Sequence, residues 1–391
     1  MLNNEKTSER VKLAFVMFTN LKVGAGTETT LFNYIKFVPK ELFDLTVIQT
    51  DYSEKSRLSQ EYVSQRLKGI RVVEWSDFKN KFKFLQDSRI GEIFLRTVIE
   101  PVLMSLTYHF VYKKLAKDFI EYDIIYLYSN QFSKFFRKSK ALVIGTSHTG
   151  LSNDRGILNR INTRLIQERL LYPRIDGYHL FPYHALQINL FKTRHNFILS
   201  NGVDTTLYHL SNTKDTSMKL KFLFVGRLEI CKGIIRLLNA WKNMQSRNDV
   251  ELHIVGDGSL GGFVSSKSIG NVIYHGKVEL LRLAELYRSC DVLIHPSQCD
   301  TLTLVVLEAA SSGLYILESD WLKGTYDDLE ENGFLEYIDV SVDGISQKID
   351  QCASNIDIIR AKKAKISQYV IENYDWEKIS SALFDKLKKM L

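Results

Sequence analysis

The sequence predicts an α/β fold with two Rossmann-like, doubly wound domains that face each other across a cleft. Three observations lead to this prediction. The chain has 391 residues, more than one hydrophobic core usually supports, so we expect two domains. Short apolar runs alternate with helix-length amphipathic segments, which is typical of parallel sheets buried on both faces. This alternation stops between residues 201 and 219 and then begins again.

The expected strands are near-continuous apolar runs rich in β-branched and aromatic residues. In the first half they cover residues 11–18, 44–50, 71–75, 123–128, 141–148 and 196–202. In the second half they cover residues 220–227, 251–258, 271–276, 291–297 and 314–319. We therefore place a first domain at residues 1–205, a second at 206–372, and an amphipathic C-terminal helix at 373–391.

Charge is unevenly distributed along the chain. Residues 1–205 contain 30 Lys and Arg against 20 Asp and Glu, a net +10, whereas residues 206–391 contain 22 against 25, a net −3. This asymmetry points to an anionic partner for the first half, such as a phosphate-bearing lipid, a membrane surface or nucleic acid. Residues 79–140 interleave basic and aromatic side chains, which fits docking on an anionic membrane. An ordinary basic surface explains the same pattern about as well.

Four cysteines, at positions 231, 290, 299 and 352, lie in the second half without the spacing of a zinc site. We expect them to be reduced, mostly buried thiols in a cytoplasmic protein. The polar N-terminus lacks the apolar core of a signal peptide. The most apolar long stretch, residues 93–112, contains charged residues and a proline, so we predict no transmembrane helix.

The stretch "HPSQCDTLTLVVLEAASSG", residues 295–313, places Asp300 and Glu308 at the two ends of an otherwise apolar run. A strand is expected to end before Asp300, and a helix to begin near residues 301–303. The free amide groups of a first helical turn favour an anion. The simpler interpretation makes Asp300 a helix cap and Glu308 a solvated helix residue.

A second charged turn lies in "FLFVGRLEICKGIIRLLNAW", residues 222–241. Arg227 and Lys232 flank a strand-to-helix turn, where a guanidinium fork and an ammonium group could converge on one diphosphate. Two unrelated surface cations are the alternative.

The first half offers weaker candidates. Gly24 and Gly26 follow the first strand and open a helix, but the third glycine of a dinucleotide fingerprint is missing. His148 lies at the carboxyl end of an expected strand, in "GTSHTG". A lone histidine is more often structural than catalytic.

Taken together, these segments resemble the retaining GT-B glycosyltransferases of family 4, also called the glycosyl transferases group 1. "FLFVGRLEICKG" is similar to the "VGR…KG" segment of that family, and "HPSQCDTLTLVVLEAASSG" to its "PSxxExFGxxxxEAxAxG" signature. "SNGVDTTLYHL" resembles the family's hinge stretch. "YDWEKISSALFDKL" resembles the terminal helix that packs back on the first domain. The matching segments cover roughly 170 residues in the expected order.

The resemblance implies a nucleoside-diphosphate sugar donor bound mainly by the second domain, and an acceptor bound by the first. Arg227 and Lys232 would hold the diphosphate without a metal or other cofactor. Glu308 would accept hydrogen bonds from the ribose, and Asp300 would contact hydroxyl groups of the transferred sugar. His148 would face that sugar near the reacting carbon.

Main-chain groups complete the implied site. The amides of Thr303 and Leu304 would meet the distal phosphate, and the turn from Gly276 to Val278 would lie beside the base. Gly26 would approach the phosphates from the other domain. The chain departs from the family pattern at Ala25, Asp300 and Thr303, which replace a glycine, a glutamate and a second glycine.

The implied function is transfer of a hexose, with retention of configuration, from a UDP-sugar to a saccharide or a lipid-phosphate-linked acceptor in cell-surface glycan biosynthesis. The expected partners are this donor, this acceptor and an anionic membrane surface at the inner face of the cell membrane, but not nucleic acid. Two alternatives stay open. A non-catalytic GT-B partner or chaperone subunit would not need the diphosphate cations. A sugar-nucleotide epimerase would turn over the donor without an acceptor.

Overall fold

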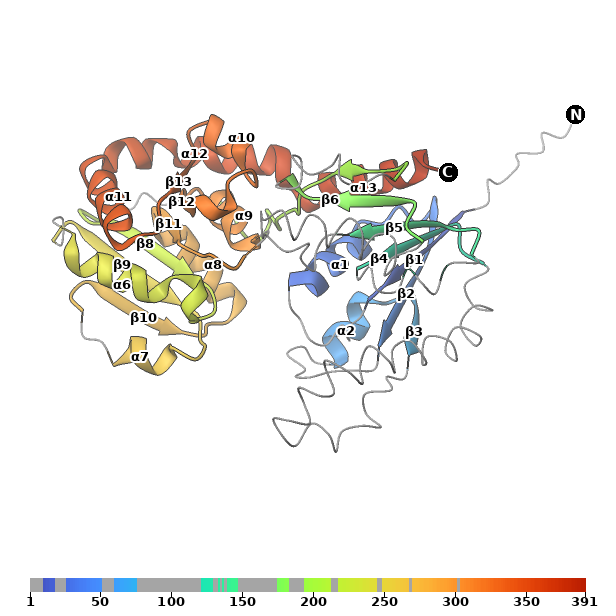
Figure 1. Cartoon of the computed structure of the whole chain (residues 1–391), viewed down its shortest axis with the longest axis horizontal. Helices are drawn as coiled ribbons and strands as arrows, with labels where there is room; N and C mark the ends of the chain where they lie inside the picture. The colour runs from blue at the N-terminus through green and yellow to red at the C-terminus, as the bar shows by residue number, and fades with distance from the viewer. Residues whose placement is uncertain are drawn as a thin grey trace, which may run out of the picture. The chain divides into compact units, whose positions relative to one another are not determined.

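The computed structural model describes residues 10–17, 26–50, 60–75, 121–128, 133, 136, 139–146, 174–182, 193–211, 217–244, 248–266, 269–300 and 303–391. It divides the chain into two compact units, each shown as a separate group of strands and helices in Figure 1. The first comprises residues 1–180, 186–199 and 380–391, and the second residues 181–185 and 200–379. The predicted boundaries at residues 205 and 372, and the predicted cleft, stay predictions.

The first unit contains a seven-stranded sheet in the order β3-β2-β1-β4-β5-β6-β7. Within the described residues, all pairings between its strands are parallel, as the sequence predicted. Its strands are Val11–Val16 (β1), Phe43–Thr50 (β2), Arg71–Trp75 (β3), Ile124–Leu127 (β4), Leu142–Thr146 (β5), Gly177–Leu180 (β6) and Phe197–Ile198 (β7). Helix α1 (Gly26–Lys36) follows β1, and α2 (Gln60–Arg66) precedes β3.

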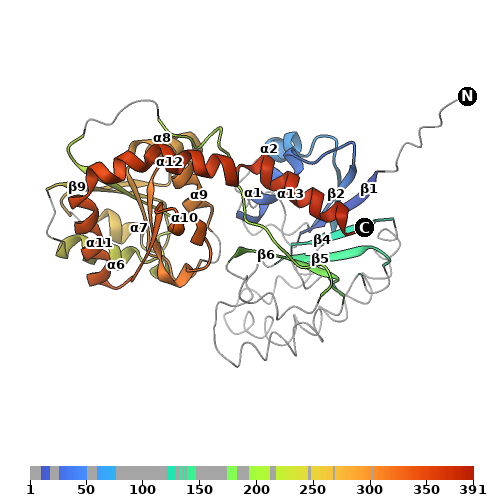
Figure 2. The same ribbon diagram turned by 90° about the horizontal axis from the view of Figure 1, so that it is seen from above.

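The C-terminal helix α13 (Trp376–Lys389) begins in the second unit, and its residues from Ser380 onward belong to the first. Its apolar face is buried at Leu383, Phe384 and Leu387. The ring of Phe384 lies 5.2 Å from that of Phe43 at the start of β2. Figure 2 shows this helix at the red end of the colour scale.

The second unit contains a six-stranded parallel sheet in the order β10-β9-β8-β11-β12-β13. Its strands are Leu220–Val225 (β8), Val250–Val255 (β9), Val272–Gly276 (β10), Val292–His295 (β11), Tyr315–Ser319 (β12) and Leu335–Ile338 (β13). Its helices include α6 (Ile234–Asn243), α7 (Gly261–Ser265), α8 (Leu280–Ser289) and α9 (Leu304–Ser311). Further along the chain lie α10 (Asp327–Glu331), α11 (Val342–Ser354) and α12 (Ile356–Tyr374).

Helices cover both faces of this second sheet (Figure 1). Buried residues of α6 and α11 form one core with alternate residues of the strands, and those of α8 and α9 form the other. Because β8 pairs with β9 on one side and β11 on the other, the chain reverses direction across the sheet between β8 and β11. In doubly wound folds, ligands bind at such a switch point, beyond the carboxyl ends of the strands.

The fold class is confirmed, with several local differences. Strands β6 and β13 were not predicted. The expected strand at 196–202 contains only two strand residues, Phe197 and Ile198. None of the helices in the described part of the chain is both long and apolar enough to cross a bilayer.

Candidate functional site

Three of the charged residues singled out in the second half lie near the switch point between β8 and β11. Arg227 and Lys232 follow β8, while Asp300 and the uncharged Thr303 follow β11. Because the two strands are parallel neighbours, their carboxyl ends meet at the same edge of the sheet. We call this edge, formed by residues 226–233, 296–300, 303 and 304, the donor edge.

The two loops of the donor edge touch at Gly233. This glycine has a φ of 81°, and a Cβ atom there would lie 2.3 Å from the carbonyl oxygen of Pro296. The loop therefore needs glycine both for its left-handed backbone and for its close approach. Arg236, in the first turn of α6, donates to the same carbonyl oxygen at 3.1 Å. The short 3-10 helix η7 (Ile230–Lys232) is thereby held against the loop that follows β11.

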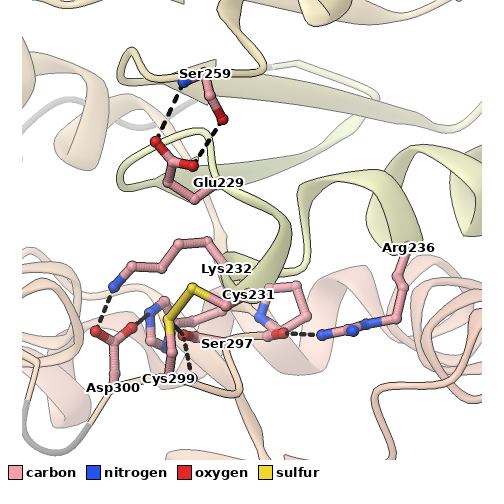
Figure 3. Close-up of a disulfide and its surroundings, with 10 residues drawn as sticks. Glu229, Cys231, Lys232, Arg236, Ser259, Ser297, Cys299 and Asp300 are labelled. Carbon is pink, nitrogen blue, oxygen red and sulfur yellow. Dashed lines mark hydrogen bonds and ion pairs between the residues drawn. A yellow bond between two sulfur atoms is a disulfide. The ribbon is translucent and has the colours of Figure 1, made fainter. Parts of the chain in front are cut away.

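Lys232 forms an ion pair with Asp300 across these loops (Figure 3). Only 13% of the Lys232 side chain and 17% of the Asp300 side chain are exposed to solvent. Burial alone would raise the pKa of Asp300, but hydrogen bonds and charges from His295 and Lys232 hold that pKa well below its usual range. The carboxylate is therefore ionised at neutral pH.

The prediction that Asp300 caps the following helix is wrong, because α9 begins four residues later, with Thr303 at its cap position.

Asp300 also faces His295, the last residue of β11. Nε2 of His295 lies 3.0 Å from Oδ2 of Asp300. Nδ1 of His295 lies 2.8 Å from Oε1 of Glu318 on the neighbouring strand β12. Burial would lower the pKa of His295, but the charges of Glu318 and Asp300 and their hydrogen bonds raise it to about 9.

Helix α9 starts at the donor edge. The side chain of Thr303 does not cap it, and the carbonyl oxygen of Thr303 accepts a hydrogen bond from the Tyr326 hydroxyl at 2.8 Å. The first amide groups of α9, beginning at Leu304, therefore have no side-chain cap and suit an anion. This is the position at which the sequence predicted contact with the distal phosphate.

Glu308 lies in the second turn of α9, where its carboxylate accepts a hydrogen bond of 2.9 Å from Tyr287 of α8. Burial raises the pKa of Glu308 to about 7, despite the opposing effect of hydrogen bonds from Tyr287 and Tyr208. A solvated helix residue would not show this shift. The structure thus favours a ligand or core role for Glu308 over the solvated one.

The remaining predicted site residues are only partly described. Arg227 is exposed on the loop after β8. Gly276 ends β10 with a φ of 67°, and Val278 packs against the core under α8. Gly26 is the first residue of α1. His148 and Gly24 lie outside the described residues.

The expectation of four reduced thiols is wrong for half of them. Cys231 and Cys299 form a disulfide, with their Cα atoms 5.6 Å apart, whereas Cys290 and Cys352 are free and buried. Both bonded cysteines are exposed, and each directly precedes a member of the Lys232–Asp300 pair. Figure 3 shows the disulfide beside that pair. The bond thus joins the two loops of the donor edge.

Sequence reasoning also missed His295, Glu318 and Tyr287. A signal was present for the first two: a histidine ends the apolar run "DVLIHPS", and a glutamate interrupts the apolar run "LYILES". Buried charges usually have partners. Their pairing across adjacent strands could be read only from the register, in which His295 faces Glu318.

Comparison with known families gives one match, in the second half of the chain. Residues 219–355 match the family model described as glycosyl transferases group 1. The matched region includes the whole donor edge and all six strands of the second sheet.

Several curated relatives align with part of the chain. It is 29% identical over 165 residues to an uncharacterized glycosyltransferase of Methanocaldococcus jannaschii, which covers 40% of this chain and 42% of the relative. It is 31% identical over 126 residues to a GDP-mannose-dependent alpha-mannosyltransferase of Corynebacterium glutamicum, covering 30% and 29%. It is 26% identical over 206 residues to a lipopolysaccharide 1,2-N-acetylglucosaminetransferase of Salmonella typhimurium, covering 48% and 52%. The chain thus spans about half, or less, of the length of these relatives.

Solved structures match over a greater length. The crystal structure of HepE from Anabaena in complex with UDP and glucose matches with a TM-score of 0.66 and 16% identity, over 97% of this chain and 100% of that one. At this identity the likeness establishes the fold alone. The two Rossmann-like sheets are those of the GT-B architecture.

Proposed function

We propose that this chain is a glycosyltransferase that moves a hexose from a nucleoside-diphosphate sugar to a saccharide or lipid-linked acceptor in cell-surface glycan biosynthesis. The observation that carries the proposal is the donor edge itself. Arg227, Lys232 and the uncapped start of α9 gather at the switch point of a glycosyl transferases group 1 domain. Positive charge and oriented amides are what a departing diphosphate requires.

Lys232 and Arg227 would bind and stabilise the leaving diphosphate. The Lys232 ammonium already has a carboxylate partner in Asp300, so donor binding would replace or share that contact. The amides of Thr303 and Leu304 would donate hydrogen bonds to the distal phosphate. Glu308 would bind the ribose, and the turn from Gly276 to Val278 would lie beside the base. Gly26 and His148 would complete the site from the first unit.

We further propose that the reaction needs no metal ion and retains the anomeric configuration. The cations and amides of the donor edge would supply the charge stabilisation that a metal supplies elsewhere. Turnover should therefore be unchanged within about twofold after treatment with EDTA. A loss of turnover that Mg²⁺ or Mn²⁺ restores would contradict metal independence. Proton NMR of the initial product would report the anomeric configuration.

The donor is proposed to be a UDP-sugar. The HepE structure contains UDP, whereas the Corynebacterium relative is named for GDP-mannose, so the base requires a direct test. The name of the Salmonella relative refers to lipopolysaccharide, which supports a surface glycan as product. The basic first half of the chain would place the enzyme in the cytoplasm at the inner face of the membrane.

Donor hydrolysis tests the proposal. The purified chain should bind UDP or GDP and slowly release the free diphosphate from UDP-glucose, UDP-N-acetylglucosamine or GDP-mannose. Lys232→Ala should weaken nucleoside-diphosphate binding by about 100-fold, because a charge-assisted contact is lost. Lys348→Ala is the matched control, since it removes another lysine–carboxylate pair, with Glu336, on the far strand β13. Equal effects of the two changes would contradict the role of Lys232.

A non-catalytic partner subunit is the second candidate function. The observation that favours it is the Lys232–Asp300 pair, which neutralises the lysine in the unliganded chain. In that case neither UDP, GDP nor any donor in the panel would raise the melting temperature of the purified chain. Binding of a donor without turnover, even with acceptor saccharides added, would also favour the subunit.

A further inference from the structure

Behind the donor edge lies a buried pair of opposite charges that the proposed function does not use. His295 and Glu318 face each other across β11 and β12, with 4% and 0% of their side chains exposed. Burying two charges costs more than their attraction often returns, and apolar residues of similar size are commonly as stable there. The pair is therefore poorly explained as a device for stability.

The ring of His295 connects this pair to the donor edge. Nδ1 lies 2.8 Å from a Glu318 oxygen, and Nε2 lies 3.0 Å from an Asp300 oxygen. A carboxylate oxygen thus lies within 3.0 Å of each ring nitrogen, and the two negative charges favour the doubly protonated, cationic imidazole. A pKa of about 9 for His295 agrees with this geometry. Positive and negative charges thus alternate from Lys232 through Asp300 and His295 to Glu318.

We propose that His295, held as a cation by Glu318, is a positioning residue that fixes Asp300 as the acceptor for a hydroxyl group of the transferred sugar. The inference rests on the proposed function and assigns a role to two residues outside the donor edge. It also accounts for a carboxylate beside a diphosphate site, where two anions would otherwise repel each other. With His295 charged, the charges of Lys232, Asp300, His295 and Glu318 sum to zero, so the negative charge of Asp300 is offset within this group.

The geometry fixes the orientation of the Asp300 carboxylate. Lys232 contacts Oδ1 and His295 contacts Oδ2, so the carboxylate is held at both oxygens. Each carboxylate oxygen has two acceptor sites, and 17% of the Asp300 side chain remains exposed. A carboxylate held in this orientation loses little freedom when a sugar hydroxyl binds.

The test replaces both members of the buried pair, His295→Leu together with Glu318→Leu. Replacing a buried pair by apolar residues is often neutral for stability, whereas removing one partner leaves an unpaired charge. Calorimetry gives the dissociation constants of UDP and UDP-glucose, or of GDP and GDP-mannose if the protein prefers guanine. We expect diphosphate affinity to stay within about threefold while the sugar-nucleotide is weakened about tenfold or more.

Two comparisons separate positioning from a structural role. In an Asp300→Asn background, the same double replacement should have no further effect on the ratio of the two dissociation constants, because His295 acts through Asp300. Arg360→Met serves as the control. It removes a partner of the buried Asp291, which precedes β11 at its opposite end, and should lower stability without changing the ratio.

The pH dependence of the same ratio is a further readout. The groups that face His295 are Glu318 from β12 and Asp300 from its own loop, with Lys232 beyond Asp300 and Tyr326 beside Glu318. The preference for the sugar-nucleotide should fall as the pH rises from 8 to 10 in the unmodified protein and stay level in the double variant. An unchanged ratio in the double variant, or an equal loss in the Asp300→Asn background, would overturn the inference. Failure to bind any nucleoside diphosphate would instead overturn the proposed function and the inference with it.

Discussion

Each of the two sheets buries a histidine near the carboxyl end of a strand, and the two histidines are in opposite charge states. His179 of β6 contacts the Tyr126 hydroxyl at 2.5 Å and the Leu199 carbonyl oxygen at 3.0 Å. Burial lowers its pKa to about 4. His295 of β11 is equally buried, but two carboxylates surround it and its pKa is raised to about 9.

The difference teaches that burial alone does not decide whether a histidine is charged. Both rings lose their contact with water, which disfavours the cation. At His179 the hydrogen bond to the Leu199 carbonyl oxygen opposes the effect of burial only in part, and the charge of Lys386 adds to it. At His295, Glu318 and Asp300 reverse the effect. The second unit has thus concentrated charge at the edge where a phosphorylated ligand is proposed to bind. In the first sheet, Phe197 stacks on the ring of His179, and the ammonium group of Lys386 lies 5.8 Å from the centre of the Phe197 ring.

The disulfide offers the largest expected effect and sharpens the contrast between the two units. It closes a sequence separation of 68 residues within the second unit. Changing Cys231 and Cys299 to Ser should lower the free energy of unfolding of that unit by up to about 4 kcal/mol, because the unfolded chain gains freedom. Urea denaturation followed by hydrogen exchange at β11 and at β6 would report each unit separately.

The control for the disulfide is chemical reduction. Dithiothreitol should destabilise the unmodified protein by the same amount and leave the double serine variant unaffected. Equal stability of the oxidised and reduced forms would contradict a stabilising cross-link. Thiol titration of the unfolded protein should find two reactive groups before reduction and four after it.

The two histidines predict opposite responses of stability to pH. The unfolded state binds a proton near pH 6.5, whereas His179 binds one only near pH 4, so the first unit loses stability as the pH falls between these values. His295 keeps its proton to about pH 9, so its contribution to the second unit is full below pH 6.5 and is lost as the pH rises to 9. Each effect amounts to at most about 3 kcal/mol.

Hydrogen exchange corrected for intrinsic rates would measure these responses at β6 and β11. His179→Gln should remove the acid loss in the first unit while keeping a hydrogen-bonding side chain. The His295→Leu, Glu318→Leu pair should remove the alkaline loss in the second. If both units responded to pH with the same sign, the assignment of opposite charge states would be wrong.

Glu308 gives the smallest expected effect and tests whether the donor edge extends to α9. Glu308→Ala should weaken nucleoside-diphosphate binding by about 2 kcal/mol, roughly 30-fold, because charge-assisted hydrogen bonds to the ribose are lost. Tyr287→Phe removes only one of the two hydrogen bonds that Glu308 accepts from tyrosines within the protein, and should have a smaller effect. Calorimetry with UDP and GDP would compare the two variants. A larger loss in Tyr287→Phe would assign Glu308 to the core.

Much of the fold could be predicted because most of the strands have a local signature in the sequence. Runs such as residues 220–225 and 292–295 are apolar throughout and bounded by turn residues, so periodicity and composition sufficed. Strand β6 begins with glycine and contains the buried His179, and β13 contains Glu336. Both lack the apolar run on which the prediction depended. Their place in the sheets follows from pairing with β5 and β12.

The sequence by itself determined that two doubly wound units exist and that Lys232 and Asp300 lie where strands give way to loops. It could do so because alternation, turn residues and strand ends are local properties of the chain. Only the tertiary structure decided that these two side chains meet, that Cys231 bonds to Cys299, and that His295 lies between two carboxylates. The Lys232–Asp300 and Cys231–Cys299 contacts each join residues 68 positions apart, and the His295–Glu318 contact joins residues 23 positions apart. Such contacts depend on strand order and register. Charge states followed from the same contacts, because a buried group takes its pKa from whatever the fold places beside it.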